Sequence, residues 1–164
     1  MIRFIMRRQL RFLPVVIAML TVLGNGLPAR AQGPKTPADL VILLEKSGHK
    51  YSKVDDNVWE IMYEGKKMAS IPVRVTMVSG VLVTLAKLAD RKNLRLDPAL
   101  LTKMLELNND FDYVELALAS SMLYVRMDSP LRLLDGAELN HVLEQVSAAA
   151  DEAYPEIKPF VAKN

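Results

Sequence analysis

The sequence predicts an α+β domain in which helices pack on an antiparallel sheet, in the order α-ββββ-α-ββ-α. Three observations support this fold class. Helix start signals occur three times along the chain. Four runs of β-branched and aromatic residues, separated by turn formers, lie between the first two helices. Two more such runs separate the second helix from the third, and no internal repeat interrupts this order.

The first helix is expected between Thr36 and Gly48. Thr36 supplies a capping hydroxyl, Pro37 suits the first helical position and Asp39 places an acid in the first turn. Leucines follow at helical spacing, and Gly48 ends the run. This segment is therefore predicted to be a short helix with one apolar face.

A four-strand meander is predicted next, over residues 50–54, 58–64, 68–77 and 81–88. The turn between the first two strands is Asp55-Asp56-Asn57, whose composition favours a hairpin loop over a ligand cluster. Ser79-Gly80 is the clearest hairpin signal. Pro72 lacks an amide donor, so its strand is expected at a sheet edge or a bulge.

The remaining elements are two helices and a second hairpin. Asp97-Pro98 repeats the cap and proline of the first helix and precedes an apolar face at 3.6-residue spacing. Strands over residues 113–118 and 122–127 flank a short turn. Asp135 caps the third helix, which is expected to end at Tyr154-Pro155 because proline disfavours helical backbone in the residue before it.

Residues 1–31 have the pattern of a secretory signal peptide. Four arginines precede the apolar run Phe12–Leu23, and the small residues Ala29 and Ala31 frame a cleavage site. The apolar run is 12 residues long, whereas a membrane-spanning helix needs about 20. We therefore expect cleavage after Ala31 and a single domain over residues 32–164. The mature domain should be periplasmic or secreted, without a stable membrane anchor.

The charge of the mature chain argues against nucleic acid as a partner. Five of the 21 basic residues precede the expected cut and none of the 19 acidic residues do, which leaves a net charge of −3. Such a domain lacks the overall positive charge that attracts the phosphate backbone of a nucleic acid. The chain has no cysteine, so disulfides cannot stabilise it and a buried core must.

The stretch LELNNDFDYVEL, residues 105–116, gathers acids and amides around Asn108. A calcium loop counted from Asn108 would need glycine sixth and glutamate twelfth, but Tyr113 and Ala119 stand there. Asn and Asp also suit the corner where a helix passes into a strand, and we predict a corner. A weak cation site at Asn108–Asp112 remains the alternative.

The chain carries no recognisable catalytic or cofactor motif. His49 and His141 have no neighbours at metal-ligand spacing, which favours surface or cap positions. We therefore predict a protein that is not an enzyme and that uses no cofactor or metal. An alternative is a small-ligand, cation-binding or enzymatic site assembled from distant residues, including Asp110, Asp112 or Glu115.

Apolar surface is the remaining candidate for function. The strand at 58–64 carries Trp59, Ile61 and Tyr63 on one face and Val58 and Met62 on the other. Core packing explains one face, and the other could contact a partner. Trp59 and Met62 are our candidate contact residues for a protein or peptide segment. The same apolar strand leaves self-association, including a homodimer, as a further alternative.

The chain resembles the YbjN family of bacterial proteins, known as sensory-transduction regulators, which share the type III secretion chaperone-like fold. The resemblance rests on Leu100–Ile157, and more weakly on the segments before it. There a helix ends in Leu105–Asn108, a hairpin covers Tyr113–Met127, and Leu131–Asp135 opens the last helix. It implies a non-enzymatic binding, chaperone-like or regulatory module. This chain differs from the commonly cytoplasmic members in its export signal.

Overall fold

The computed structural model describes residues 33–162, which belong to one compact unit, Gln32–Asn164. The expected signal peptide and its cleavage site therefore lie outside the described residues. None of the described helices combines the length and hydrophobicity needed to cross a membrane.

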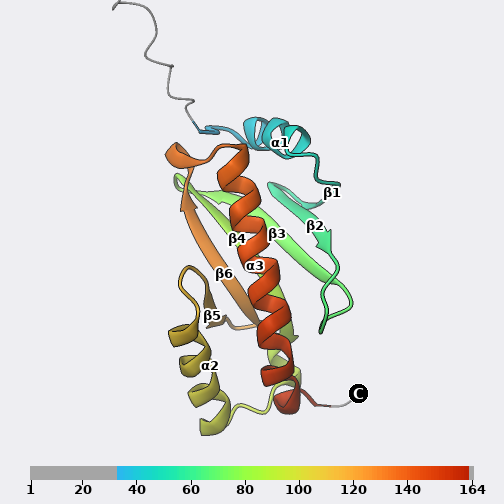
Figure 1. Cartoon of the computed structure of the whole chain (residues 1–164), viewed down its shortest axis with the longest axis vertical. Coiled ribbons are helices and arrows are strands. Elements are labelled where there is room, and N and C mark those ends of the chain that lie inside the picture. Colours follow the sequence, from blue (N-terminus) through green and yellow to red (C-terminus); the bar gives the residue numbers. More distant parts are fainter. Residues whose placement is uncertain (1–32, 163–164) are drawn as a thin grey trace, which may run out of the picture. The chain divides into compact units, whose positions relative to one another are not determined.

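The described chain follows the predicted order of helices and strands (Figure 1). The helices are α1 Pro37–Lys46, α2 Pro98–Asp110 and α3 Gly136–Ile157, with short 3-10 turns η1 Arg91–Asn93, η2 Leu131–Leu133 and η3 Lys158–Phe160. The strands are β1 Tyr51–Asp55, β2 Val58–Tyr63, β3 Ile71–Val78, β4 Val81–Asp90, β5 Glu115–Leu118 and β6 Met122–Pro130. The α+β prediction is confirmed.

The six strands form one antiparallel sheet in the order β1-β2-β3-β4-β6-β5. Two-residue turns connect β1 to β2 and β3 to β4, and Asn57 and Ser79 adopt left-handed backbone there, with φ of 58° and 49°. The predicted hairpin turns are thus present. Pro72 does not mark a sheet edge, because β3 lies between β2 and β4 in the sheet. Pro72 comes just before Val73, the residue at which β3 begins to pair with β4. A missing donor is tolerated at such a strand start.

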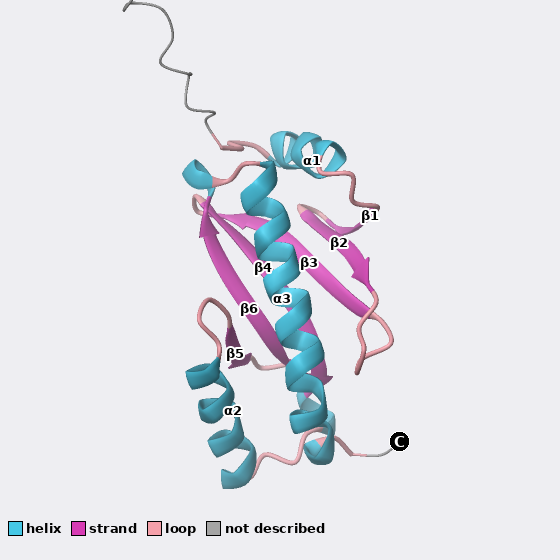
Figure 2. Ribbon diagram, in the orientation of Figure 1, coloured by secondary structure: helices cyan, strands magenta, loops and turns pink. Residues whose placement is uncertain are grey.

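The long helix α3 lies across one face of the sheet (Figure 2). Its inward side, including Leu139, Leu143, Val146 and Ala150, is fully buried against the strands. Burial of this apolar stripe stabilises the fold, because removing apolar area from water is the dominant favourable term in folding.

Side-chain caps set the starts of all three helices. Thr36, the predicted cap of α1, forms a capping box with Asp39, while Asp97 and Asp135 accept backbone N–H bonds at the starts of α2 and α3. The end of α3 differs from the prediction, because Pro155 lies inside the helix and α3 continues to Ile157. Buried Ile157 fixes this last turn by packing, which outweighs the proline penalty.

Candidate binding surface

The sheet has a second face, opposite α3, that carries a mixture of apolar and charged side chains. Successive strand residues point to opposite faces, and the buried members of β4 and β6 alternate with partly exposed ones. We call the apolar group on this second face the open sheet face. The name covers Val58 and Met62 on β2, Val83 and Leu85 on β4, and Tyr124 on β6. It leaves out Val78 and Val81, which lie on the same face next to the β3–β4 turn.

Leu85 lies at the centre of the open sheet face. Register pairs it with Arg74 of β3 on one side and with Arg126 of β6 on the other. Arg74 donates to Glu60 at 2.8 Å, and Arg126 donates two bonds to Asp128, at 2.7 and 2.6 Å. These ion pairs hold the arginine heads in place on either side of a leucine.

The fixed arginines give the surface a defined electrostatic pattern. Hydrogen bonding to Asp128 is the main reason that the pKa of Arg126 lies above its ordinary value. Arginine side chains can cover apolar surface with their stems while their heads stay in water. An apolar centre with charged groups around it is the usual anatomy of a protein-protein contact.

The two contact residues expected from the sequence lie on opposite faces of β2. Trp59 is only 5% exposed and belongs to the core, where register sets it beside Val75. Trp59 is therefore a core residue and does not belong to an exposed contact surface. Met62 is 55% exposed and lies on the same face as Glu60. A role for Met62 in partner contact stays a prediction.

The acid-rich stretch at the end of α2 forms the predicted corner between helix and strand. Asn108 turns its amide to the backbone of Leu116 in β5, accepting from its N–H at 2.6 Å and donating to its C=O at 3.1 Å. Asp110, Asp112 and Glu115 are exposed. Asn108 is thus engaged in joining α2 to the edge strand, and a weak cation site here receives no geometric support.

The two histidines contact different parts of the structure. The His49 ring lies 2.9 Å from the Asn140 oxygen of α3, which connects the segment after α1 to that helix. His141 lies on the surface with its ring 6.1 Å from that of Tyr113. Among residues 33–162, no group of three or more metal-ligating side chains converges.

Sequence reasoning missed the arrangement of Leu85 between Arg74 and Arg126, because strand register alone brings these residues together. One local signal was available. Glu60 alternates with Trp59 and Ile61 along β2, and a charged side chain marks the solvent face of a half-buried strand. That signal places Met62 outside and Trp59 inside.

Comparison with known proteins supports the fold and goes no further. No protein-family model and no curated protein sequence matches this chain. Its structure is similar to the crystal structure of YbjN from E. coli, described as a putative transcription regulator. The TM-score is 0.53 at 13% sequence identity, over 74% of this chain and 92% of the other. The likeness to YbjN that the sequence suggested is therefore present in the fold.

Proposed function

We propose that this protein is an exported, non-enzymatic binding module that holds an apolar segment of another protein on its open sheet face. The observation that carries the proposal is the position of Leu85 between two arginines that their own acids hold in place. The YbjN-like fold is consistent with a regulatory or chaperone-like role. Periplasmic or secreted localisation is part of the proposal and rests on residues 1–31.

The test is affinity capture by residues 32–164 from an envelope extract of the source cells. The parent is compared with Met62→Asp and Leu85→Asp, which each place an acid on the open sheet face. Leu105→Asp is the matched control, because Leu105 is 71% exposed on α2, away from that face. Circular dichroism first establishes that every variant is folded.

We expect a partner that the parent and Leu105→Asp retain and that both sheet variants lose. Retention by both sheet variants would show that binding uses another surface and would overturn the proposal. Trp59→Asp is unsuitable here, because Trp59 is a core residue and a buried charge would destabilise the fold itself.

Self-association through the sheet edges receives less support than binding on its face. Asn108 occupies the outward backbone groups of Leu116 on one edge strand. The other edge strand, β1, has an irregular register between Lys53 and Asp55 and is mostly polar. Bulges and charges of this kind block edge-to-edge pairing. Sedimentation across a wide concentration range tests for a homodimer directly.

A further inference from the structure

A pocket lies at the end of the sheet where the chain enters α1. It has a volume of about 680 Å³ and lies between the tips of the β1–β2 and β3–β4 hairpins, the segment 33–37 and η2. This volume falls within the range of small-molecule sites, about 300–1,000 Å³. The open sheet face contributes none of its five residues to this pocket.

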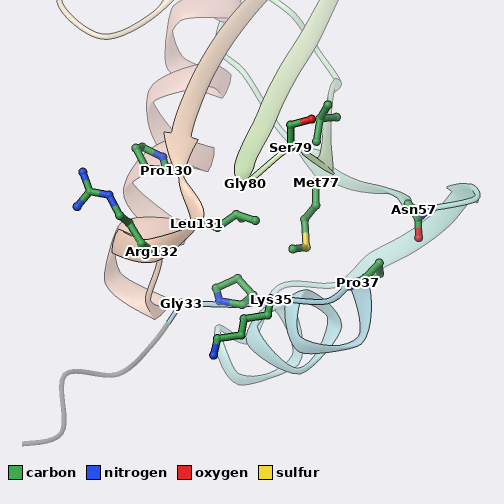
Figure 3. Close-up of a pocket in the computed structure, with 12 residues that line it drawn as sticks. Gly33, Lys35, Pro37, Asn57, Met77, Ser79, Gly80, Pro130, Leu131 and Arg132 are labelled. Atoms are coloured by element: carbon green, nitrogen blue, oxygen red, sulfur yellow. The ribbon is translucent and has the colours of Figure 1, made fainter.

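The pocket has an apolar interior. Leu131 and Met77 project toward its centre, as Figure 3 shows, and three prolines complete much of the wall. Leu131 is nearly buried and Met77 is partly buried. A flexible thioether beside a leucine can accommodate an aliphatic chain.

The charged residues of the pocket are all cationic. Its lining includes Lys35 and Arg132 and no acidic residue. Both side chains are exposed, lie at the rim with their heads directed outward, and form no ion pair with any residue in 33–162 (Figure 3). Two exposed cationic side chains therefore lie beside an apolar cavity, although residues 32–164 carry a net charge of −3.

The wall that carries Lys35 is held close to η2. A Cβ on Gly33 would overlap the carbonyl oxygen of Leu131, so only glycine allows the backbone to approach this closely. The neighbouring Pro34 is buried. The position of Lys35 relative to Arg132 thus follows from backbone packing.

From this arrangement we propose that the pocket binds a small anionic amphiphile, an aliphatic chain ending in a carboxylate. The chain occupies the cavity over Met77 and Leu131, and the carboxylate lies at the rim, where Arg132 can donate two parallel hydrogen bonds and Lys35 adds charge. This site goes beyond the proposed protein-binding function and uses different residues.

Decanoate, below its micelle-forming concentration, is the probe. Calorimetry on residues 32–164 measures its affinity beside acetate, decanol and decyltrimethylammonium, and amide NMR locates the site. We expect decanoate to shift the Gly80 amide and to bind about tenfold more tightly than decanol, because one charge-assisted contact is worth about that factor. Acetate and the cationic amphiphile should bind more weakly still.

Variants separate the pocket from adventitious binding. Arg132→Gln and Lys35→Gln should each lower decanoate affinity toward that of decanol, whereas Lys92→Gln, an exposed lysine on η1, should leave it unchanged. Met77→Glu should weaken decanoate binding, and circular dichroism first establishes that this variant is folded, because Met77 packs against the core. The proposal is wrong if decanol binds as well as decanoate, if neither cation variant weakens binding, or if the NMR shifts lie outside the pocket.

Discussion

Asn108 of α2 and Leu116 of β5 are joined by two hydrogen bonds between the side-chain amide of one and the backbone of the other. The Asn108 oxygen accepts from the Leu116 N–H at 2.6 Å, and its NH₂ donates to the Leu116 C=O at 3.1 Å. The opposite side of β5 pairs with β6. The asparagine therefore takes the place of a neighbouring strand at this edge of the sheet.

We predict that Asn108→Ala destabilises the fold by about 1–2 kcal/mol, because it removes two partners from partly buried backbone groups. Chemical denaturation measures the loss, and faster hydrogen exchange at the Leu116 amide would localise it. Asn109→Ala is the control, since Asn109 is exposed on the same helical turn. Equal stability of the two variants would show that the edge does not depend on Asn108.

The sequence was informative wherever structure is set by neighbouring residues. The caps at Thr36, Asp97 and Asp135 lie within a few residues of the groups they bind, so helix starts could be predicted. The same holds for the two hairpin turns, whose strained positions are occupied by Asn57 and Ser79.

The sequence failed where packing between distant segments decides the outcome. Pro155 predicts a helix end, but the helix continues through it to Ile157, which is buried in the core. Trp59 reads as a possible contact, but alignment with Val75 places it in the core. The pocket joins residues that lie far apart in the sequence, Lys35 and Arg132 among them. No spacing in the sequence could reveal that convergence.

Thr84 is the clearest case of a core residue whose replacement should raise stability. Its side chain is fully buried under α3, and its hydroxyl has no hydrogen-bond partner among the described residues. Thr84→Val keeps the shape and removes the unsatisfied group, so we expect a gain of about 1 kcal/mol. Thermal and chemical unfolding measure it.

A threonine on the opposite face provides the comparison for this prediction. Thr76 lies in the row that β3 contributes to the second face of the sheet, between Val58 and Val83, and is partly exposed. Thr76→Val should change stability by less than about 0.5 kcal/mol. A destabilised Thr84→Val variant would instead indicate that the hydroxyl has a partner, such as a buried water.

Tyr63 should make the stability of the fold depend on pH in the alkaline range. Burial, with a smaller contribution from the negative charge of Glu144, raises its pKa from 10.0 to about 12. The unfolded chain therefore loses the phenolic proton first as pH rises. The stability linked to Tyr63 is complete below pH 10 and is lost as pH rises toward about 12.

Tyr63→Phe isolates this effect. The variant has no phenolic proton at this position, so its unfolding free energy should fall less steeply than that of the parent between these pH values. It should also be at least as stable at neutral pH, because the Tyr63 hydroxyl has no partner among the described residues. Ultraviolet titration of the parent should show one tyrosine that ionises at a higher pH than a free tyrosine and that the variant lacks. Identical titration curves for the two proteins would contradict a raised pKa at Tyr63.

Asp151 of α3 should control stability at the acidic end of the pH range. Its carboxylate accepts from the backbone N–H groups of Lys66, Lys67 and Met68 at 2.9, 2.8 and 2.7 Å, holding the loop between β2 and β3 against the helix. Desolvation alone would raise its pKa, but these three bonds and the charge of Lys67 outweigh it and the pKa is lowered. The stability it contributes is present above the unfolded value of 3.8 and is lost as pH falls through the folded value.

Replacing this carboxylate should therefore destabilise the fold at neutral pH and make its stability less dependent on pH in the acidic range. We expect Asp151→Asn to have a lower melting temperature than the parent at pH 7. The difference between the two melting temperatures should become smaller as pH falls below 3.8. Glu152→Gln, at an exposed neighbouring position, should keep the acid response of the parent. Gly65→Ala tests the same contact from the loop side, because its Cβ would overlap the Asp151 carboxylate and the Met68 carbonyl. A parent-like melting temperature in both Asp151→Asn and Gly65→Ala would mean that this loop does not depend on the aspartate.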